Sequence, residues 1–222
     1  MKGWTIFAHS VRLVFSNLDA AFKVSLLPYA LSALAFVFLG AGAIERVQEG
    51  STVGVMAPDA NALGGFLIYG LVAAIAALWI AVSWHRFVLL EEYPSSWFPQ
   101  FHGGRIAAYF GRGLLIGLLI FAFMMVCMIV STLFASLLGP QAIILSGFAA
   151  IIVATYLFYR LCPMLPSAAI GQPMTVGEAW RATANSSGAI AILVVLLMLP
   201  SLVVQLPNQI GGADSVVGII YS

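Results

Sequence analysis

The sequence predicts an all-α, polytopic membrane protein, a bundle of helices that cross the bilayer. Three observations indicate this fold class. Hydrophobic residues make up 62% of the chain and charged residues only 8%, whereas a soluble domain carries about 25% charged residues. The mean hydropathy is +1.06, and the apolar residues form uncharged stretches of spanning length. Helix is the expected structure because lipid offers no hydrogen-bond partner to an open strand edge.

Five stretches have the composition of spanning helices, and none contains a charged residue. They cover residues 24–44, 62–84, 113–138, 142–159 and 189–206. A short apolar segment, 216–222, follows them. We interpret it as the first turns of a sixth span, since seven residues are too few to cross a bilayer; the alternative is a short tail at the membrane interface. We expect residues 1–222 to form a single integral membrane domain.

The basic residues indicate how the spans are oriented. Eight of the nine Lys and Arg residues fall in segments on one side of the membrane, and only Arg46 falls on the other. Because short cytoplasmic loops carry the excess of Lys and Arg, we expect a cytoplasmic N-terminus. The net charge of only +1 argues against a nucleic-acid partner, which would require a basic face.

Residues 4–18 are predicted to form an amphipathic helix. Arg12 and several polar residues fall on one face at helical spacing. The opposite face carries Trp4, Phe7, Val11, Val14, Phe15 and Leu18. This pattern is typical of a helix that lies flat among the lipid headgroups. The alternative is an ordinary amphipathic helix packed on the protein's own surface.

Two further cytoplasmic segments repeat this pattern. Arg105 and Arg112 share a helix face before the third span, and a capping-box sequence at Thr175 begins a third amphipathic helix before the fifth. The chain therefore suggests three units, each with an interfacial helix, an outward span and a returning span. Gly113 and Gly117 form a GxxxG pattern that predicts close helix packing. The predicted membrane-interface anchors are Trp4, Phe7, Arg12, Trp84, Trp97, Arg105, Arg112, Trp180 and Arg181.

No catalytic or cofactor-binding motif is recognisable in the sequence. A phosphate-binding loop, HExxH, CxxC and Gly-x-Ser-x-Gly are all absent, so we predict no catalytic residue, metal ligand or cofactor. His85, Glu91, Glu92 and His102 offer a metal site as an alternative. We favour a simpler interpretation, in which these are the charged residues expected of a wet interfacial loop. The predicted spans contain none of the charged side chains that mark an ion pathway.

One segment resembles a known family. Tyr159–Pro163, Pro166–Ile170, Thr175–Arg181 and Asn185 together resemble a segment of six-helix bacterial inner-membrane proteins of uncharacterised function. That family is related to the membrane domain that accompanies some glycerophosphodiester phosphodiesterases. The resemblance implies a location in the cell inner membrane. It also implies a span, a proline-bearing loop, a cytoplasmic amphipathic helix with a central tryptophan, and another span. None of its motifs is catalytic.

These observations favour a non-enzymatic accessory or scaffold subunit that packs against membrane lipids and a larger membrane complex. The uncharged spans, the aromatic cytoplasmic segments and the missing catalytic motifs all point this way. The alternative is a small transporter or lipid-handling protein with an uncharged cavity between its helices. That cavity would be lined by Pro28, Tyr29, Pro200 and Gln205.

Overall fold

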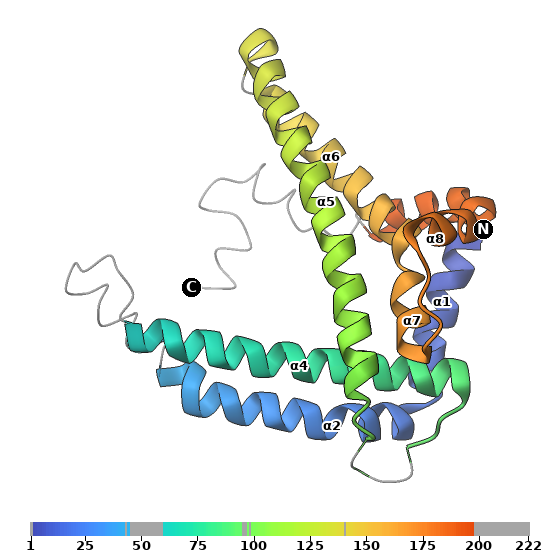
Figure 1. Ribbon diagram of the computed structural model, residues 1–222. Coiled ribbons are helices and arrows are strands. Elements are labelled where there is room, and N and C mark those ends of the chain that lie inside the picture. The colour runs from blue at the N-terminus through green and yellow to red at the C-terminus, as the bar shows by residue number, and fades with distance from the viewer. Residues whose placement is uncertain are drawn as a thin grey trace, which may run out of the picture. The chain divides into compact units, whose positions relative to one another are not determined.

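The computed structural model describes residues 2–42, 44, 60–94, 97, 99–139 and 141–197 (Figure 1). All regular structure in these ranges is helical, so the predicted all-α fold class is confirmed. The 216–222 segment lies outside the described residues. In chain order the elements are α1 (Lys2–Phe15), α2 (Leu18–Ala35), a π-helical turn η1 (Phe36–Gly40), α4 (Ala60–Leu90), α5 (Gly103–Leu138), α6 (Gln141–Leu161), α7 (Met164–Ile170), α8 (Val176–Ala182) and a 3₁₀ turn η2 (Ala184–Ser186).

Four helical stretches among the described residues are long and apolar enough to cross a membrane. They are Leu18–Gly40, Leu63–Leu90, Gly103–Leu138 and Gln141–Ile170. A fifth results if Val176–Ala182 and Ala184–Leu197, which meet at 47°, count as one bent span. The shortest has 23 residues, which at ~1.5 Å per residue exceeds the ~30 Å hydrocarbon core of a bilayer. The chain thus has the helices of a membrane-embedded protein.

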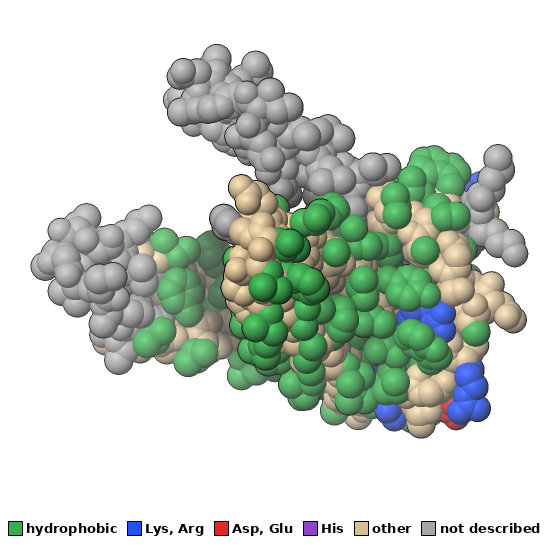
Figure 2. Space-filling model, turned by 90° about the horizontal axis from the view of Figure 1, so that it is seen from above, with side chains coloured by type: hydrophobic (Ala, Val, Ile, Leu, Met, Phe, Trp, Pro, Cys, Tyr) green, Lys and Arg blue, Asp and Glu red, His purple; other side chains and the backbone are tan. Residues whose placement is uncertain are grey.

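The surfaces of these helices suit a lipid environment. Only 6% of the most apolar window of α5 is buried inside the protein. Large side chains of α5 such as Phe121, Val126 and Leu133 are exposed, and Figure 2 shows hydrophobic side chains over most of the described surface in view. In water a continuous apolar surface of this kind would drive association, whereas acyl chains cover it without penalty.

The first amphipathic helix is shorter than predicted. Instead of residues 4–18, α1 covers Lys2–Phe15, and the first span begins at Leu18 rather than Val24. Asn17 causes the break: its backbone leaves the helical region (φ −127°, ψ 39°), and its Nδ2 donates to the Leu13 carbonyl at 2.8 Å. The side chain thereby satisfies a carbonyl that the end of a helix leaves without a partner.

The predicted separate interfacial helix before the third span is wrong, because Gly103–Leu138 is one continuous helix. No proline interrupts this stretch, and an unbroken ladder of backbone hydrogen bonds is the best solution where lipid replaces water. The corresponding helix before the fifth span does exist as α8. Its predicted capping box is present, with Thr175 N donating to Glu178 Oε2 at 2.7 Å and Glu178 N donating to Thr175 Oγ1 at 3.3 Å.

The helices group into two compact units. The hairpin unit contains the described residues within 13–113 and 165–173, and the second unit contains the described residues within 2–12, 114–164 and 174–197. In the hairpin unit α2 and α4 lie side by side (Figure 1), and the rings of Phe36 and Tyr69 meet edge to face at 5.4 Å between centroids. Buried Val82, Ile106 and Ala169 pack together and join α4, the start of α5 and α7. This cluster supports the site described next.

Candidate functional site

The hairpin unit contains a polar pocket of about 430 Å³ beside the C-terminal part of α4. This volume falls in the range of small-molecule sites, roughly 300–1,000 Å³. The pocket lies where α4 ends, at Leu90. Its lining residues are Val24, Ser83, Arg86, Glu92, Tyr93, Pro94, Pro99, Gln100 and His102.

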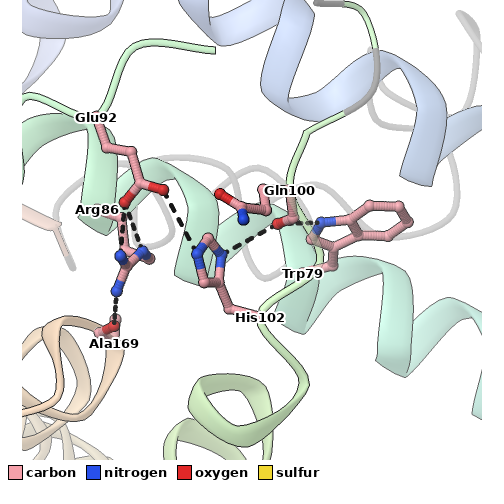
Figure 3. Close-up of polar contacts among 6 residues, drawn as sticks. All are labelled: Trp79, Arg86, Glu92, Gln100, His102 and Ala169. Atoms are coloured by element: carbon pink, nitrogen blue, oxygen red, sulfur yellow. Dashed lines mark hydrogen bonds and ion pairs between the residues drawn. The ribbon is translucent and has the colours of Figure 1, made fainter. Parts of the chain in front are cut away.

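An ion pair between Arg86 and Glu92 forms part of the pocket wall (Figure 3). The Arg86 Nε and Nη2 both lie 2.7 Å from Glu92 Oε2. Glu91 makes this contact possible, because its positive φ of 53° reverses the chain directly after α4 and returns Glu92 to the helix. Only about a few per cent of non-glycine residues adopt a positive φ, so the site includes a locally strained turn.

Arg86 also reaches α7. Its Nη1 donates to the Ala169 carbonyl at 3.2 Å, which satisfies one of the acceptors at the helix C-terminus. Gly171, two residues further on, has φ +87°, and a Cβ there would lie 2.5 Å from the Arg105 guanidinium. Two arginines therefore lie at the end of α7, where the helix dipole favours positive charge.

His102 connects the pocket to the loop after α4. Its Nε2 lies 3.4 Å from Glu92 Oε1, and its Nδ1 lies 3.2 Å from the Gln100 carbonyl oxygen. Both ring nitrogens thus lie within contact distance of an oxygen atom. The same carbonyl accepts from Trp79 Nε1 at 3.3 Å, so the loop is tied to α4 on two sides (Figure 3).

The structure does not gather the four residues of the alternative metal site. His85 lies beside Tyr109, with its Nε2 3.4 Å from the hydroxyl, and Glu91 is exposed at the turn. Among the residues that the structure describes, no three His, Cys, Asp or Glu side chains are placed to hold a metal ion. Glu92 and His102 instead form the pair described above.

The second unit contains a buried arginine, Arg160, whose contacts the sequence analysis did not predict. Arg160, at the end of α6, is only 5% exposed, and its guanidinium lies 4.0 Å from the centre of the Trp180 ring. Its Nη2 donates to the Trp180 carbonyl at 2.7 Å, and its Nη1 to the Tyr156 hydroxyl at 3.3 Å. In the described part of the chain no carboxylate lies within ion-pair distance of Arg160. The only sequence signal was an arginine directly after an apolar span.

The predicted interface anchors occupy mostly exposed positions. Trp4 is 62% exposed and Trp180 43%. Phe7, Arg12, Trp97, Arg105 and Arg181 are also exposed, while Trp84 and Arg112 are half-buried. Exposure alone does not test whether these side chains contact lipid, so that contact stays a prediction. In the GxxxG pair, a Cβ added at Gly113 would lie 3.8 Å from Leu165, an ordinary contact distance. A Cβ added at Gly117 would have no described atom within 4 Å.

Of the four residues named for an uncharged cavity between the helices, the structure describes Pro28 and Tyr29, and neither lines the uncharged hollow described below. Pro28 is buried in the packing of α2, and Tyr29 is 69% exposed; Pro200 and Gln205 lie outside the described residues. A hollow without charged residues, about 390 Å³, does occur between η1 and the start of α4. Its lining residues are Phe38, Leu39, Gly42, Asn61, Gly64, Gly65 and Ile68.

Comparisons with protein-family models, with curated proteins and with solved structures found no match to this chain. The resemblance of residues 159–185 to six-helix inner-membrane proteins therefore stays a prediction. The fold defines the class: an all-α protein whose described residues include four or five helices of membrane-spanning length and composition.

Proposed function

We propose that the protein is a non-enzymatic multi-pass membrane protein that binds the polar headgroup of a membrane lipid in the pocket beside Arg86. One observation carries the proposal. A pocket of about 430 Å³ with a guanidinium and a carboxylate on its wall lies at the end of a helix long enough to span the bilayer. Arg86 is four residues from the end of the Leu63–Leu90 stretch, which is headgroup depth for such a span.

The composition of the pocket wall also suits a lipid. Val24, Tyr93, Pro94 and Pro99 supply apolar surface beside the polar groups. Ligand sites commonly combine an apolar lining with a few polar groups that fix orientation. A phospholipid is divided in the same way, with a charged phosphate next to its glycerol and acyl chains.

The arrangement of charges supports binding rather than catalysis. Glu92 contacts Arg86 through one carboxylate oxygen and His102 through the other. A nucleophilic mechanism requires a base within hydrogen-bond reach of a Ser, Cys or similar group. The candidate bases Glu92 and His102 instead contact each other, the Arg86 guanidinium and the Gln100 carbonyl oxygen. Such contacts hold these groups in fixed positions.

In this proposal the pocket faces the cytoplasmic leaflet of an inner membrane, and the N-terminus lies on the same side. The support is the distribution of basic residues, with Arg86, Arg105 and Arg112 between the second and third predicted spans and only Arg46 on the opposite side. Positive loops are retained in the cytoplasm, and the anionic lipids of that leaflet attract them.

The test is retention of lipid by the full-length protein. Protein purified in mild detergent from its native membranes is extracted, and the phospholipid bound per chain is measured by mass spectrometry. Arg86→Ala should retain roughly tenfold less than the unchanged protein, the effect expected when one hydrogen bond to a charged group is lost. Arg86→Lys should lie between the two, because lysine keeps the charge without the fork of donors.

Lys23→Ala is the control, since Lys23 is a basic residue of α2 that pairs with Asp19 and does not line the pocket. It should leave lipid retention unchanged. Equal retention by folded Arg86→Ala and Lys23→Ala proteins would contradict the proposal.

A second candidate function, an accessory or scaffold subunit of a larger membrane complex, is favoured by α1. All of its described side chains from Trp4 to Phe15 are exposed except Leu13, which is half-buried. A helix with so little intramolecular packing needs lipid or another protein to cover its apolar face. Purification from native membranes after crosslinking tests this role. A stoichiometric partner lost on Phe7→Asp supports it, and repeated recovery of the chain alone counts against it.

A further inference from the structure

We infer that the pocket beside Arg86 selects a zwitterionic headgroup, one that carries both a phosphate and a primary ammonium group. This inference rests on the proposed function and specifies the ligand class of the same site. It depends on which hydrogen-bonding groups of the pocket remain unused, and on their charges.

Glu92 provides an acceptor with spare capacity. Its Oε2 receives both Arg86 contacts at 2.7 Å, whereas among the described residues its Oε1 has only the long 3.4 Å contact with His102. An ionised carboxylate offers about four lone-pair positions, and the Glu92 side chain is 33% exposed. A ligand group that donates hydrogen bonds and carries positive charge fits this oxygen.

Arg86 and Ser83 provide unused donors close by. Of the five N–H groups of a guanidinium, Arg86 commits three, two to Glu92 and one to the Ala169 carbonyl. The buried Ser83 Oγ has no hydrogen-bond partner among the described residues. Ser83 is three residues before Arg86 and so lies on the same face of α4. Phosphate oxygens would accept from these groups.

The balance of charge favours a ligand with both signs. Arg86 and Glu92 cancel each other on the pocket wall, so a purely anionic headgroup would meet the Glu92 carboxylate as well as the arginine. Such like-charge contacts are how binding sites reject the wrong partner. Arg105, the other arginine nearby, lies against Gly171 and is not one of the lining residues.

The ammonium must carry N–H groups. A quaternary ammonium has none and is recognised by faces of several aromatic rings. Among the described lining residues, Tyr93 carries the one aromatic ring besides the His102 imidazole. A carboxylate with an open lone pair therefore matches a primary ammonium better than a choline group.

The experiment compares three lipids on the full-length protein. Delipidated protein in detergent is titrated with phosphatidylethanolamine, phosphatidylglycerol and phosphatidylcholine, and bound lipid is counted by native mass spectrometry. The unchanged protein should prefer the ethanolamine lipid over both others by roughly tenfold, the equivalent of one charge-assisted hydrogen bond. Glu92→Gln should abolish this preference. Asp19→Asn is the control, since it removes an exposed carboxylate of α2 that does not line the pocket and should preserve the preference.

The outcomes separate this inference from the proposed function. Suppose that binding depends on Arg86 but that phosphatidylglycerol binds as well as or better than phosphatidylethanolamine. This result would overturn the preference for a zwitterionic headgroup and leave the proposed headgroup binding intact. A preference unchanged by Glu92→Gln would do the same. Absence of any Arg86-dependent binding would overturn both. The comparison of lipids on the unchanged protein decides without a substitution, so a variant that fails to fold does not prevent the test.

Discussion

The guanidinium of Arg160 lies 4.0 Å from the centre of the Trp180 ring, and its Nη2 donates to the Trp180 backbone carbonyl. A second contact, from Thr183 Oγ1 to the Arg160 carbonyl at 3.2 Å, runs between the same two segments. Together these contacts hold α8 against the end of α6. Arg160 is buried without a carboxylate within ion-pair distance among the described residues. Its charge is therefore stabilised by the Trp180 indole face, the Trp180 carbonyl and the Tyr156 hydroxyl.

Trp180→Ala should lower the stability of the protein by about 2 kcal/mol, the value of a desolvated cation–π contact. Trp180→Phe keeps a ring under the guanidinium and should cost less. Thermal unfolding in detergent, followed by circular dichroism, measures both. Arg181→Ala is the control, because Arg181 is an exposed neighbour. Equal melting temperatures for Trp180→Ala and Arg181→Ala would show that the contact contributes nothing.

Gly171→Ala should destabilise the hairpin unit. The residue has φ +87°, and the new Cβ would lie 2.5 Å from the Arg105 guanidinium. Arg105→Ala in the same chain removes the clash but leaves the left-handed backbone, which costs about 1 kcal/mol for a residue with a Cβ. Gly171→Asn should be tolerated better than Gly171→Ala once Arg105 is removed, since asparagine enters this region more readily.

The control for that series is Gly117→Ala. Gly117 lies inside α5 with no described atom within 4 Å of an added Cβ, so alanine should raise helix stability by up to ~1 kcal/mol. If chemical denaturation showed Gly171→Ala to be as harmless as Gly117→Ala, the described geometry at the end of α7 would be wrong.

Thr175→Ala should loosen the start of α8. It removes the hydroxyl that accepts from Glu178 N, and loss of an N-cap of this kind costs about 1 kcal/mol. Thr175→Ser keeps the hydroxyl and should behave like the unchanged protein. Hydrogen exchange of the amides in residues 176–182 reports the effect. Thr132→Ala, which removes an exposed hydroxyl of α5 bonded to its own helix, should not alter exchange in α8.

Phe7→Asp should release α1 from the membrane interface. Burying one large apolar side chain is worth roughly 1.5–3 kcal/mol, so an aspartate there should raise amide exchange over residues 2–15 by about tenfold or more in lipid nanodiscs. His9→Asp places the same charge on the polar face and should have a smaller effect. Identical exchange in both variants would mean that the Phe7 face of α1 does not contact lipid.

Properties that depend on neighbours along the chain were predictable from sequence. Spanning helices follow from uncharged runs of sufficient length, and the capping box at Thr175 follows from residues three apart. Local patterns nevertheless gave a wrong helix boundary before the third span. The polar face containing Arg105 and Arg112 suggested a separate helix, yet it belongs to α5, because no residue in that stretch prevents the helical hydrogen bonds from continuing.

The tendency of a segment to span the membrane is the sum of the hydropathies of its consecutive residues. The all-α class and its apolar helices could therefore be inferred from the sequence alone. The pocket and the contacts of Arg160 could not be inferred in this way. Glu92 meets Arg86 only because Glu91 turns the chain back at φ 53°, and Arg86 reaches Ala169, 83 residues away, only because α7 packs on α4. Arg160 and Trp180 are likewise brought together by the packing of α8 on α6. Such contacts join residues distant in sequence, and hydropathy and spacing carry no information about which distant segments meet; the tertiary structure decided them.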